Sequence, residues 1–353
     1  QLTTLTPYQK LKVSILVRIT AVGSYLGFIF YLIARGTDEL IPFVNGITTG
    51  FLAGLFTAII EIYMFGKRAN QLKFIWYFAL RVVTYSVCLG LILLNVTAVS
   101  QMYRFNLGYF EVLQSERFQY YIEHGSYRSE LEYIIALVVV VNFTRIMSQR
   151  LGQGVLLDYV KGTYHIPVQE QRIFMFVKVK DSEKHLENVG ALKYHQFLNI
   201  LYRDLVIPVL SHQGMVYEYV EDLMVISWKV NDGLKNANCI EMFFQLLKSI
   251  EKEASNYLDR IGFIPELKAS ANCGTVIGSE IGEIKTQIVY QGDTLNTTAR
   301  ILQKVTPLNE HLLISEPLFK LMNKSTNRFK ITEHNHIKLR GKNDETNLYG
   351  VNQ

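Results

Sequence analysis

Long uncharged segments fill much of the first 150 residues, where residues 19–34, 40–60 and 82–103 contain no Asp, Glu, Lys or Arg. A helix that crosses the hydrocarbon core of a bilayer needs ~20 mostly apolar residues. These three segments, the first of them extended by residues 11–18, therefore predict membrane spans. Residues 133–144 form a shorter uncharged segment. We predict a fourth span there, because charged side chains at helix ends can extend to the membrane interface.

Basic residues mark one side of these spans. They precede the first span, separate the second from the third and follow the fourth, whereas the two other connections mix acidic and basic residues. Lys and Arg concentrate in the cytoplasmic connections of membrane proteins. We therefore predict a multi-pass protein of the inner (cytoplasmic) membrane with both termini in the cytoplasm. The basic clusters are Lys10 and Lys12; Lys67, Arg68 and Lys73; and Arg145, Arg150 and Lys161.

Two features of the predicted spans indicate an anchor rather than a pore or a transporter. A transport pathway needs charged side chains at mid-depth, whereas those of this region lie toward the predicted helix ends. Gly46, Gly50 and Gly54 repeat at a spacing that lets two helix backbones approach closely, so we expect them to pack within a bundle or a dimer. The charged residues at the helix ends are Arg18, Glu61, Arg81 and Arg145.

After residue 150 the pattern alternates between amphipathic helices and short β-favouring runs. Helices interleaved with hairpins indicate an α+β domain with a largely antiparallel sheet and flanking helices. We predict an all-α membrane domain of four transmembrane helices at 1–150, a helical connector at 151–170 and a cytoplasmic domain at 171–353. Helices are expected at 186–210, 237–257 and 294–302, and strands at 173–179, 215–220, 223–228, 267–277, 284–290, 311–314, 329–332, 337–339 and 347–351.

Composition and charge narrow the classes of partner. Of the 353 residues, 49% are hydrophobic, which supports a part that lies in a membrane. We assign the net charge of +5 to the cytoplasmic connections, and we expect the lipid bilayer rather than a nucleic acid as a partner. Cys88, Cys239 and Cys273 form no CxxC pair, which argues against a disulfide framework and a structural zinc site.

Four runs stand out in the second half of the chain: FMFVKVKDS from residue 174, MVYEYVEDLMVISW from residue 215, CGTVIGSEIGEIKTQIVYQGDTLNTTARI from residue 273 and IKLRGK from residue 337. They resemble the class III adenylate/guanylate cyclase homology domain, and the YHIP segment from residue 164 resembles the connector of membrane-bound bacterial cyclases. The resemblance covers about residues 154–351. Its most specific part is GDTLNTTAR, in which Gly-Asp follows a strand and Asn and Arg share one helix face.

The resemblance implies a ferredoxin-like α+β domain that makes a cyclic nucleotide. In this family the ribose 3′-hydroxyl of ATP or GTP attacks the α-phosphate of the same molecule, and pyrophosphate leaves. Two divalent ions, Mg²⁺ or Mn²⁺, bridge the phosphates. Each site lies between two domains, one supplying metal-binding carboxylates and the other the Asn/Arg pair. The resemblance thus implies a homodimer, or a heterodimer with another cyclase-domain protein.

Most site residues of the family have a match in this chain. The resemblance implies metal binding by Asp222, ribose orientation by Asn296, stabilisation of charge on the α-phosphate by Arg300, contact with the terminal phosphates by Arg340, and purine recognition by Glu218 and Gln287. Many ATP-specific cyclases have a lysine and an acid at the last two positions, so the choice of purine stays open. Taken singly, Asp222 also fits an ordinary hairpin turn, Asn296 a helix start with a local hydrogen bond, and Arg300 a solvated helix face.

The first metal-binding position departs from the family, because Lys178 stands where an aspartate is expected. At ~4 Å and an effective dielectric constant of ~20, each unit-charge pair is worth about 4 kcal/mol, so an ammonium group here repels Mg²⁺. We predict that Lys178 and Asp222 form an ion pair across adjacent strands. Asp181 points to the opposite side of the strand and is not expected to replace the missing acid. Glu221 replaces the glycine before Asp222, which predicts a reshaped turn.

Three functions fit this sequence. We favour a membrane-anchored cyclase-like subunit that is catalytically impaired alone and acts as a dimerising regulatory subunit, or pseudoenzyme. The alternative is an active homodimeric adenylate or guanylate cyclase that converts ATP or GTP to the cyclic nucleotide and pyrophosphate. The third is a structural membrane protein whose cyclase-like domain binds another protein and no nucleotide.

Overall fold

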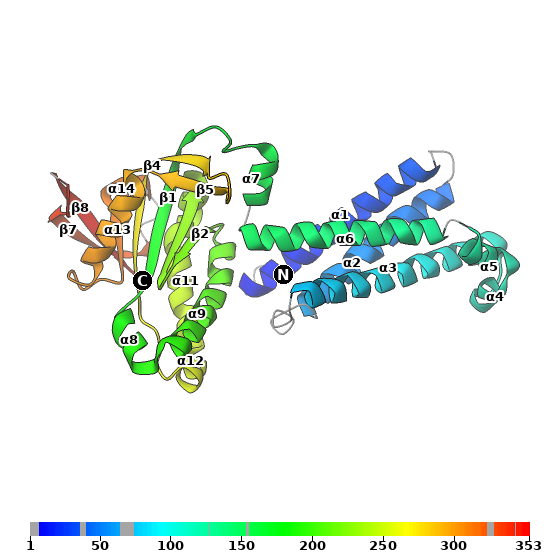
Figure 1. The fold of residues 1–353 in the computed structure, drawn as a ribbon, viewed down its shortest axis with the longest axis horizontal. Coiled ribbons are helices and arrows are strands. Elements are labelled where there is room, and N and C mark those ends of the chain that lie inside the picture. Colours follow the sequence, from blue (N-terminus) through cyan, green and yellow to red (C-terminus); the bar gives the residue numbers. More distant parts are fainter. Residues whose placement is uncertain are drawn as a thin grey trace. The chain divides into compact units, whose positions relative to one another are not determined.

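The computed structural model describes residues 7–35, 40–63, 74–125, 127–152, 155–322, 328–342 and 344–353. The chain divides into two compact units, Gln1–Met147 and Ser148–Gln353 (Figure 1). The division falls near residue 150, where the sequence predicts the end of the membrane domain. The predicted basic cluster of Lys67, Arg68 and Lys73 lies outside the described residues.

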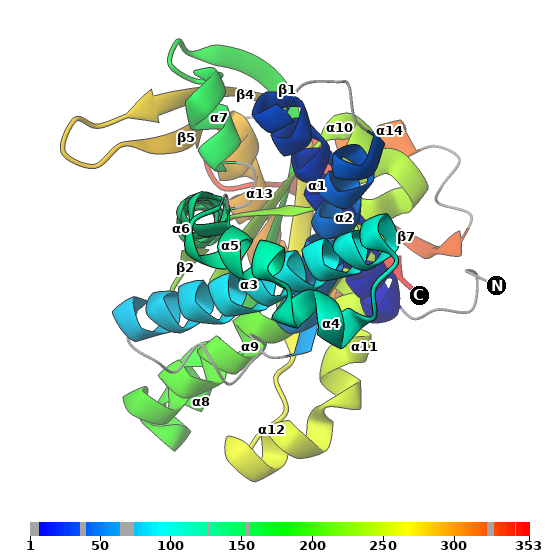
Figure 2. The ribbon, with the colours of Figure 1, turned by 90° about the vertical axis from the view of Figure 1, so that its right-hand side faces the viewer.

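The first unit is built from helices (Figure 2). Among the described residues, three helical segments are long and apolar enough to cross a membrane: Phe43–Glu61, Phe74–Phe105 and Tyr127–Ser148. The first helix contributes a shorter apolar segment, Leu16–Ile29, so the four predicted spans are not established. The helices are α1 (Pro7–Arg35), α2 (Leu40–Tyr63), α3 (Phe74–Phe105), α4 (Tyr109–Gln114), α5 (Glu116–Glu123) and α6 (Tyr127–Leu151).

Glycines bring α1 and α2 into backbone contact, which confirms the close packing predicted from their spacing. A Cβ atom added to Gly50 would lie 2.4 Å from the carbonyl oxygen of Gly23. A Cβ atom on Gly27 would lie 2.2 Å from the carbonyl oxygen of Gly46, and one on Gly54 would lie 2.7 Å from the Cα of Thr20. The small residues therefore allow a packing that larger side chains would prevent.

A buried ionic network joins α2, α3 and α6. Arg81 is 1% exposed; its guanidinium donates to the Glu61 carboxylate and, at 3.0 Å, to Oδ1 of Asn142. Glu61 also accepts a hydrogen bond from the Tyr85 hydroxyl at 2.8 Å and pairs with Arg145 at 2.9 Å. The sequence places these charges only near helix ends. The structure shows that they are paired with one another inside the bundle, as charges of low exposure must be.

The second unit is an α+β domain with a mixed sheet. The strands are ordered β2-β3-β1-β4-β6-β8-β7, and β5 pairs with β4. The β4–β6 pair is parallel and the other pairs are antiparallel. The strands are β1 (Val168–Val179), β2 (Met215–Val220), β3 (Leu223–Lys229), β4 (Leu267–Ile281), β5 (Gln287–Gln291), β6 (Leu312–Ser315), β7 (Lys330–Lys338) and β8 (Glu345–Asn352).

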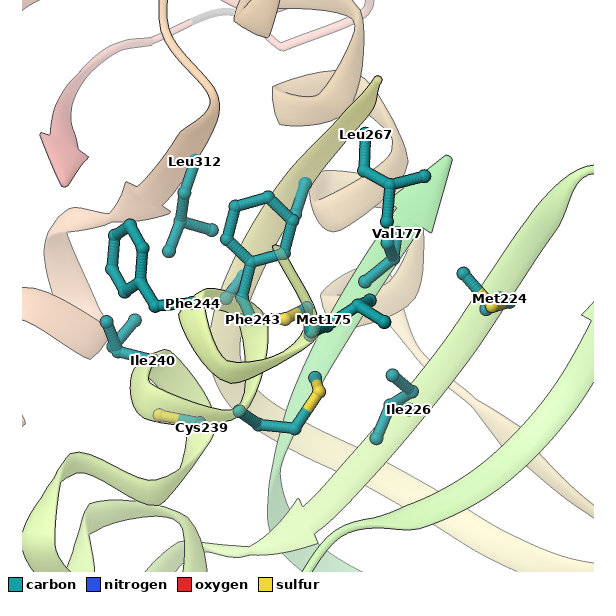
Figure 3. Close-up of a cluster of buried hydrophobic side chains, with 14 of the residues drawn as sticks. Met175, Val177, Met224, Ile226, Cys239, Ile240, Phe243, Phe244, Leu267 and Leu312 are labelled. Atoms are coloured by element: carbon teal, nitrogen blue, oxygen red, sulfur yellow. The ribbon is translucent and has the colours of Figure 1, made fainter. Parts of the chain in front are cut away.

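Helices cover both faces of this sheet. They are α7 (Val155–Lys161), α8 (Ser182–Val189), α9 (Ala191–Ser211), α10 (Val230–Leu234), the 3-10 helix η3 (Lys235–Ala237), α11 (Asn238–Lys252), α12 (Ala254–Arg260), α13 (Asp293–Val305) and α14 (Glu316–Met322). On one face, Met175 and Val177 of β1 pack in a core with Phe243 of α11 (Figure 3). On the other face, Phe174 and Phe176 pack with the apolar side of α13. Because both faces are buried, β1 reads as a continuous apolar run.

Some predicted elements are divided or extended. The helix predicted at 186–210 is two helices, because Gly190 has a positive φ of 80° between α8 and α9. The helix predicted at 237–257 breaks at Glu253 into α11 and α12. In the described part of the connector, Leu151 ends α6 and α7 is a separate short helix, and β1 begins five residues before its predicted start at residue 173. The short strands predicted at 329–332 and 337–339 form one irregular strand, β7.

Candidate functional site

Lys178 and Asp222 meet at the end of β1. Lys178 pairs with Leu223 in the sheet register, so Asp222, which precedes Leu223, comes beside it. The Lys178 Nζ lies 3.5 Å from Oδ1 of Asp222. The lysine side chain is 38% exposed and the aspartate side chain is 8% exposed. The ion pair predicted from the sequence is therefore present, with its negative member the more buried.

Two tyrosines on α9 add to the surroundings of Asp222. Burial and the negative charge of Asp222 raise the pKa of Tyr194 and that of Tyr202 to about 12. The phenols therefore stay neutral beside the carboxylate. Among the described residues, Oδ2 of Asp222 has no hydrogen-bond partner. One oxygen of this carboxylate thus faces Lys178, and the other is buried without a partner in the described part of the chain.

This donor set does not fit the two divalent ions that the family resemblance implies. In the part of the chain that the structure describes, no group of three or more His, Cys, Asp or Glu side chains is placed to hold a metal. Asp181, at the start of α8, has its Oδ1 3.8 Å from Nζ of Lys184. Asp222 is left as one carboxylate beside one ammonium group, and hard divalent cations take several oxygen ligands.

The turn between β2 and β3 positions Asp222. It has two residues between the paired Val220 and Leu223, and Glu221 adopts a positive φ of 52°. The hydroxyl of Tyr202 donates a hydrogen bond to the Glu221 carbonyl oxygen. The turn therefore keeps the left-handed backbone that glycine favours, and the glutamate bears the strain. The sequence predicts a reshaped turn; the structure shows a strained one.

Helix α13 carries Asn296 and Arg300 on its outward side. Its inward side is held by two hydrogen bonds from β4 side chains: Asn272 donates to the carbonyl oxygen of Thr294 at 3.1 Å, and Ser270 donates to that of Thr298 at 2.8 Å. A Cβ atom on Gly274 would lie 2.5 Å from Oγ1 of Thr294, so this glycine permits the close approach of the helix.

Asn296 is exposed and Arg300 is half-buried. Within the described residues, no hydrogen bond holds the Asn296 side chain, so the local helix-start bond considered from the sequence is not seen. Arg300 has a neighbour in the turn after β7, because a Cβ atom on Gly341 would lie 3.5 Å from its Nη2. This turn also contains Arg340, which is exposed. The structure therefore brings the turn that contains Arg340 to the side chain of Arg300.

Lys342 and Asp293, which are not among the site residues predicted from the sequence, form an ion pair beside Arg300. The hydrogen bond from Lys342, together with the charges of Lys342 and Arg300, lowers the pKa of Asp293. The sequence signal is present, since Asp293 belongs to GDTLNTTAR and Lys342 to IKLRGK. In the described residues, no ion pair or hydrogen bond links this group to Lys178 and Asp222.

The two positions expected to contact a purine lie on different strands. Glu218 is on β2 at a bulge, and Gln287 is the first residue of β5; both side chains are exposed. Their strands are connected through Tyr217, whose hydroxyl accepts a hydrogen bond from the Tyr290 amide at 3.1 Å. A hydrogen bond thus relates the strands of the two residues, while among the described residues no hydrogen bond or ion pair joins the side chains of Glu218 and Gln287 themselves.

A polar cluster that was not predicted from the sequence fixes the connector to the sheet. The buried Tyr164 donates a hydrogen bond to Glu170 at 2.9 Å and accepts one from the Tyr290 hydroxyl at 3.0 Å. Arg172 donates to the same Glu170 oxygen at 3.1 Å, and its guanidinium lies 4.6 Å from the Tyr290 ring centroid. Helix α7 lies beside the β4–β5 hairpin (Figures 1 and 2).

Comparison with known proteins identifies relatives of the second unit. Residues 167–353 match the family model described as the adenylate and guanylate cyclase catalytic domain. A relative named adenylate cyclase 2, from Rhizobium meliloti (strain 1021), is 35% identical over 190 residues. That match covers 54% of this chain and 52% of the relative, so the chain spans about half the length of this curated relative.

Solved structures share the fold at low sequence identity. The structure of a bacterial light-regulated adenylyl cyclase has a TM-score of 0.52 and 15% identity, and the match covers 63% of this chain and 64% of that one. The crystal structure of the adenylyl cyclase CyaB from P. aeruginosa has a TM-score of 0.47 and 14% identity, over 53% of this chain and 96% of that one. At 15% identity, the similarity to the light-regulated adenylyl cyclase is a similarity of fold alone.

Proposed function

Because this chain belongs to the adenylate and guanylate cyclase catalytic domain family, we propose that it is a membrane-anchored class III cyclase-like subunit whose own site is catalytically impaired. It acts as a dimerising regulatory subunit, with itself or with another cyclase-domain protein. The three long apolar helices support the anchoring. The cytoplasmic side of the inner membrane is the proposed location of the cyclase unit.

The observation that carries this proposal is the contact between Lys178 and Asp222. An ammonium group 3.5 Å from the carboxylate neutralises the charge that would attract a divalent ion. At ~4 Å and an effective dielectric constant of ~20, exchanging attraction for repulsion at one position alters the interaction by several kcal/mol. Since about 1.4 kcal/mol is a factor of ten, metal affinity falls by orders of magnitude.

Asn296 and Arg300 are unaffected by this change, because they lie on a different element, α13. In a pair of domains they would serve the site whose acids come from the other chain. The impaired chain can therefore complete the site of a partner that has both aspartates. It binds ATP or GTP there through Arg300 and Arg340, with Glu218 and Gln287 at the purine positions.

The test compares nucleotide cyclisation by the full chain and by Lys178→Asp, in the same lipid environment, with ATP or GTP and with Mg²⁺ or Mn²⁺. We expect background turnover by the unaltered chain and a large gain in the variant. Lys268→Asp is the matched control, because Lys268 lies directly opposite Lys178 on β4 and the substitution changes the same charge. A gain in the control as large as in Lys178→Asp would contradict a specific role for position 178.

An active homodimeric adenylate or guanylate cyclase is the second candidate. It is favoured by the retained Asp222, Asn296 and Arg300, and by the Asp222 oxygen that has no partner among the described residues. Strong turnover by the unaltered chain would establish it and exclude the impaired subunit. A chain that binds only protein would show no heat of binding with a non-hydrolysable ATP or GTP analogue in calorimetry.

A further inference from the structure

A cavity of about 520 Å³ lies inside the helical first unit. Its walls come from α1 and α2 on one side and from α3 and α6 on the other, and α5 contributes at one end. Binding sites for small molecules typically measure ~300–1,000 Å³. The cavity is therefore large enough for a ligand, and it lies far along the chain from the residues assigned to nucleotide chemistry.

Most of the cavity wall is apolar. The α1–α2 wall includes Gly23 and Gly50, where the two helix backbones pack directly against each other. Leu89 and Leu93 of α3 and Leu137 of α6 line the opposite wall. Such walls suit a hydrocarbon chain, because burial of apolar surface is favourable and needs no polar partner.

The two ends of the cavity differ in polarity. At one end Asn142 and Tyr85 reach the wall, but their polar groups are engaged: Asn142 accepts from Arg81 and donates to the Val138 carbonyl oxygen at 2.9 Å. Tyr85 donates to Glu61. This end therefore offers little to a polar group of a ligand and suits the tip of an apolar chain.

The other end carries two cations. The guanidinium of Arg117 lies 4.7 Å from the Phe105 ring centroid, and that of Arg104 lies 5.9 Å from it. Within the described residues neither arginine has a carboxylate partner. The acid on this part of the wall, Glu130, accepts a hydrogen bond from the Tyr121 hydroxyl at 2.7 Å. Two exposed guanidinium groups therefore flank the mouth of an apolar cavity.

We propose that this cavity binds a single-chain amphiphile with a carboxylate head group, that is, a long-chain fatty acid. Its chain occupies the space between the α1–α2 and α3–α6 walls, and its carboxylate lies between Arg104 and Arg117. Guanidinium groups bind carboxylates through paired charge-assisted hydrogen bonds. The connection that holds both arginines is the one whose mixed charge predicts a non-cytoplasmic position, so the ligand enters from outside the cell membrane.

The test uses the full chain in nanodiscs of zwitterionic phosphatidylcholine and follows displacement of the fluorescent fatty acid cis-parinaric acid. We expect saturable displacement by oleate, and at least about tenfold weaker displacement by methyl oleate, which has the same chain without the charge. In the double variant Arg104→Gln/Arg117→Gln, displacement of cis-parinaric acid by oleate should be as weak as displacement by methyl oleate. These arginines are exposed, so their replacement leaves the helical packing intact.

A second variant tests the cavity itself. Leu93→Trp fills the apolar part of the cavity and should abolish saturable binding, whereas Val140→Trp, at an exposed α6 position outside the lining, should not. Equal displacement by oleate and its methyl ester would overturn the proposal. So would unsaturable uptake that is the same in both tryptophan variants, because that is the behaviour of a fatty acid dissolved in the surrounding lipid.

Discussion

Lys178 shows how one side chain alters what a strand end can bind. Its side chain lies on the same face of β1 as Phe174 and Phe176. Unlike those two buried side chains it is partly exposed, and it reaches Asp222. The more buried aspartate needs a counter-charge, since an unpaired charge of low exposure is costly. In a metal-binding relative a cation of the solvent would serve that purpose. Here the counter-charge is covalently part of the protein.

Glu221 is a second residue with a local cost. A non-glycine residue in the left-handed region is strained by about 1–2 kcal/mol, and glycine at the same position relieves that strain. Glycine also loses about 0.5–1 kcal/mol more conformational entropy on folding, which offsets part of the relief. We therefore expect Glu221→Gly to raise the free energy of unfolding by about 0.5–1 kcal/mol. The chain has two tryptophans, so in a Trp76→Phe background the fluorescence of the buried Trp228 reports unfolding of the second unit.

The control for Glu221 is its neighbour Val220, the last residue of β2. Val220→Gly should lower stability, because glycine in a strand loses entropy and gains no relief of strain. If both glycine variants lose stability, the positive φ of Glu221 is not a source of strain.

Much of the site could be predicted residue by residue from the sequence, and the limit is physical. Lys178 and Asp222 were predictable as a pair, because the resemblance to the cyclase family implies that these two positions meet on adjacent strands. The Asp293–Lys342 pair and the Tyr164 cluster were not, because each joins residues from distant segments whose approach depends on packing. Periodicity identifies the face on which a side chain lies, but not the partner that reaches it.

Helix packing in the first unit depends on the glycines of α1 and α2. A Cβ atom on Gly50 would lie 2.4 Å from a backbone oxygen of α1, and a backbone cannot move aside as a side chain can. We expect Gly50→Ala to destabilise the bundle by about 1–3 kcal/mol, the usual cost of overpacking. Loss of helicity during titration with sodium dodecyl sulfate, followed by circular dichroism, measures this change.

Gly90 on α3 offers a matched control. A Cβ atom there would meet only side chains, at 3.1 Å from Leu131 and 3.5 Å from Tyr127, and these can shift. Gly90→Ala should therefore change the stability of the bundle little. The higher helix propensity of alanine also favours the variant. Equal losses for the two variants would mean that the α1–α2 contact has no special role in the bundle.

Element types were predicted more accurately than element boundaries. The hairpin β2–β3 and the helix α13 follow from clear alternation and helical spacing. The break between α8 and α9 depends on the backbone conformation of Gly190, and the early start of β1 depends on pairing with β4. In the first unit, the fourth span was predicted too short, because it was ended at the charged residues on either side. The sequence does not reveal that one of these, Arg145, is neutralised by Glu61 from another helix.

At the scale of the whole molecule, the family's division of labour between two domains predicts complementation. The double variant Lys178→Asp/Arg300→Ala has the acids but lacks the arginine, so it should be inactive as a homodimer. The unaltered chain has the arginine but lacks the acid. We expect cyclase activity when the two are co-expressed with different tags and isolated as mixed dimers, because one of the two sites then holds both components.

A mixture of Lys178→Asp/Arg300→Ala with Arg300→Ala is the control, since neither chain then supplies the arginine. Activity in that mixture would show that Arg300 is dispensable. If Lys178→Asp is active alone but the first mixture is not, the acids and the arginine of a site come from the same chain, and the arrangement between two domains is wrong for this protein.

The burial of Tyr164 has a mechanical consequence. Its hydroxyl is hydrogen-bonded both to Glu170 of β1 and to Tyr290 of β5. The connector therefore cannot rotate independently of these two strands at this point. A twist applied to that segment must either break two hydrogen bonds or turn both strands. Each of these strands leads to a different part of the candidate site. Strand β1 leads to Lys178, and β5 leads through Gly292 into α13, the helix that carries Asn296 and Arg300.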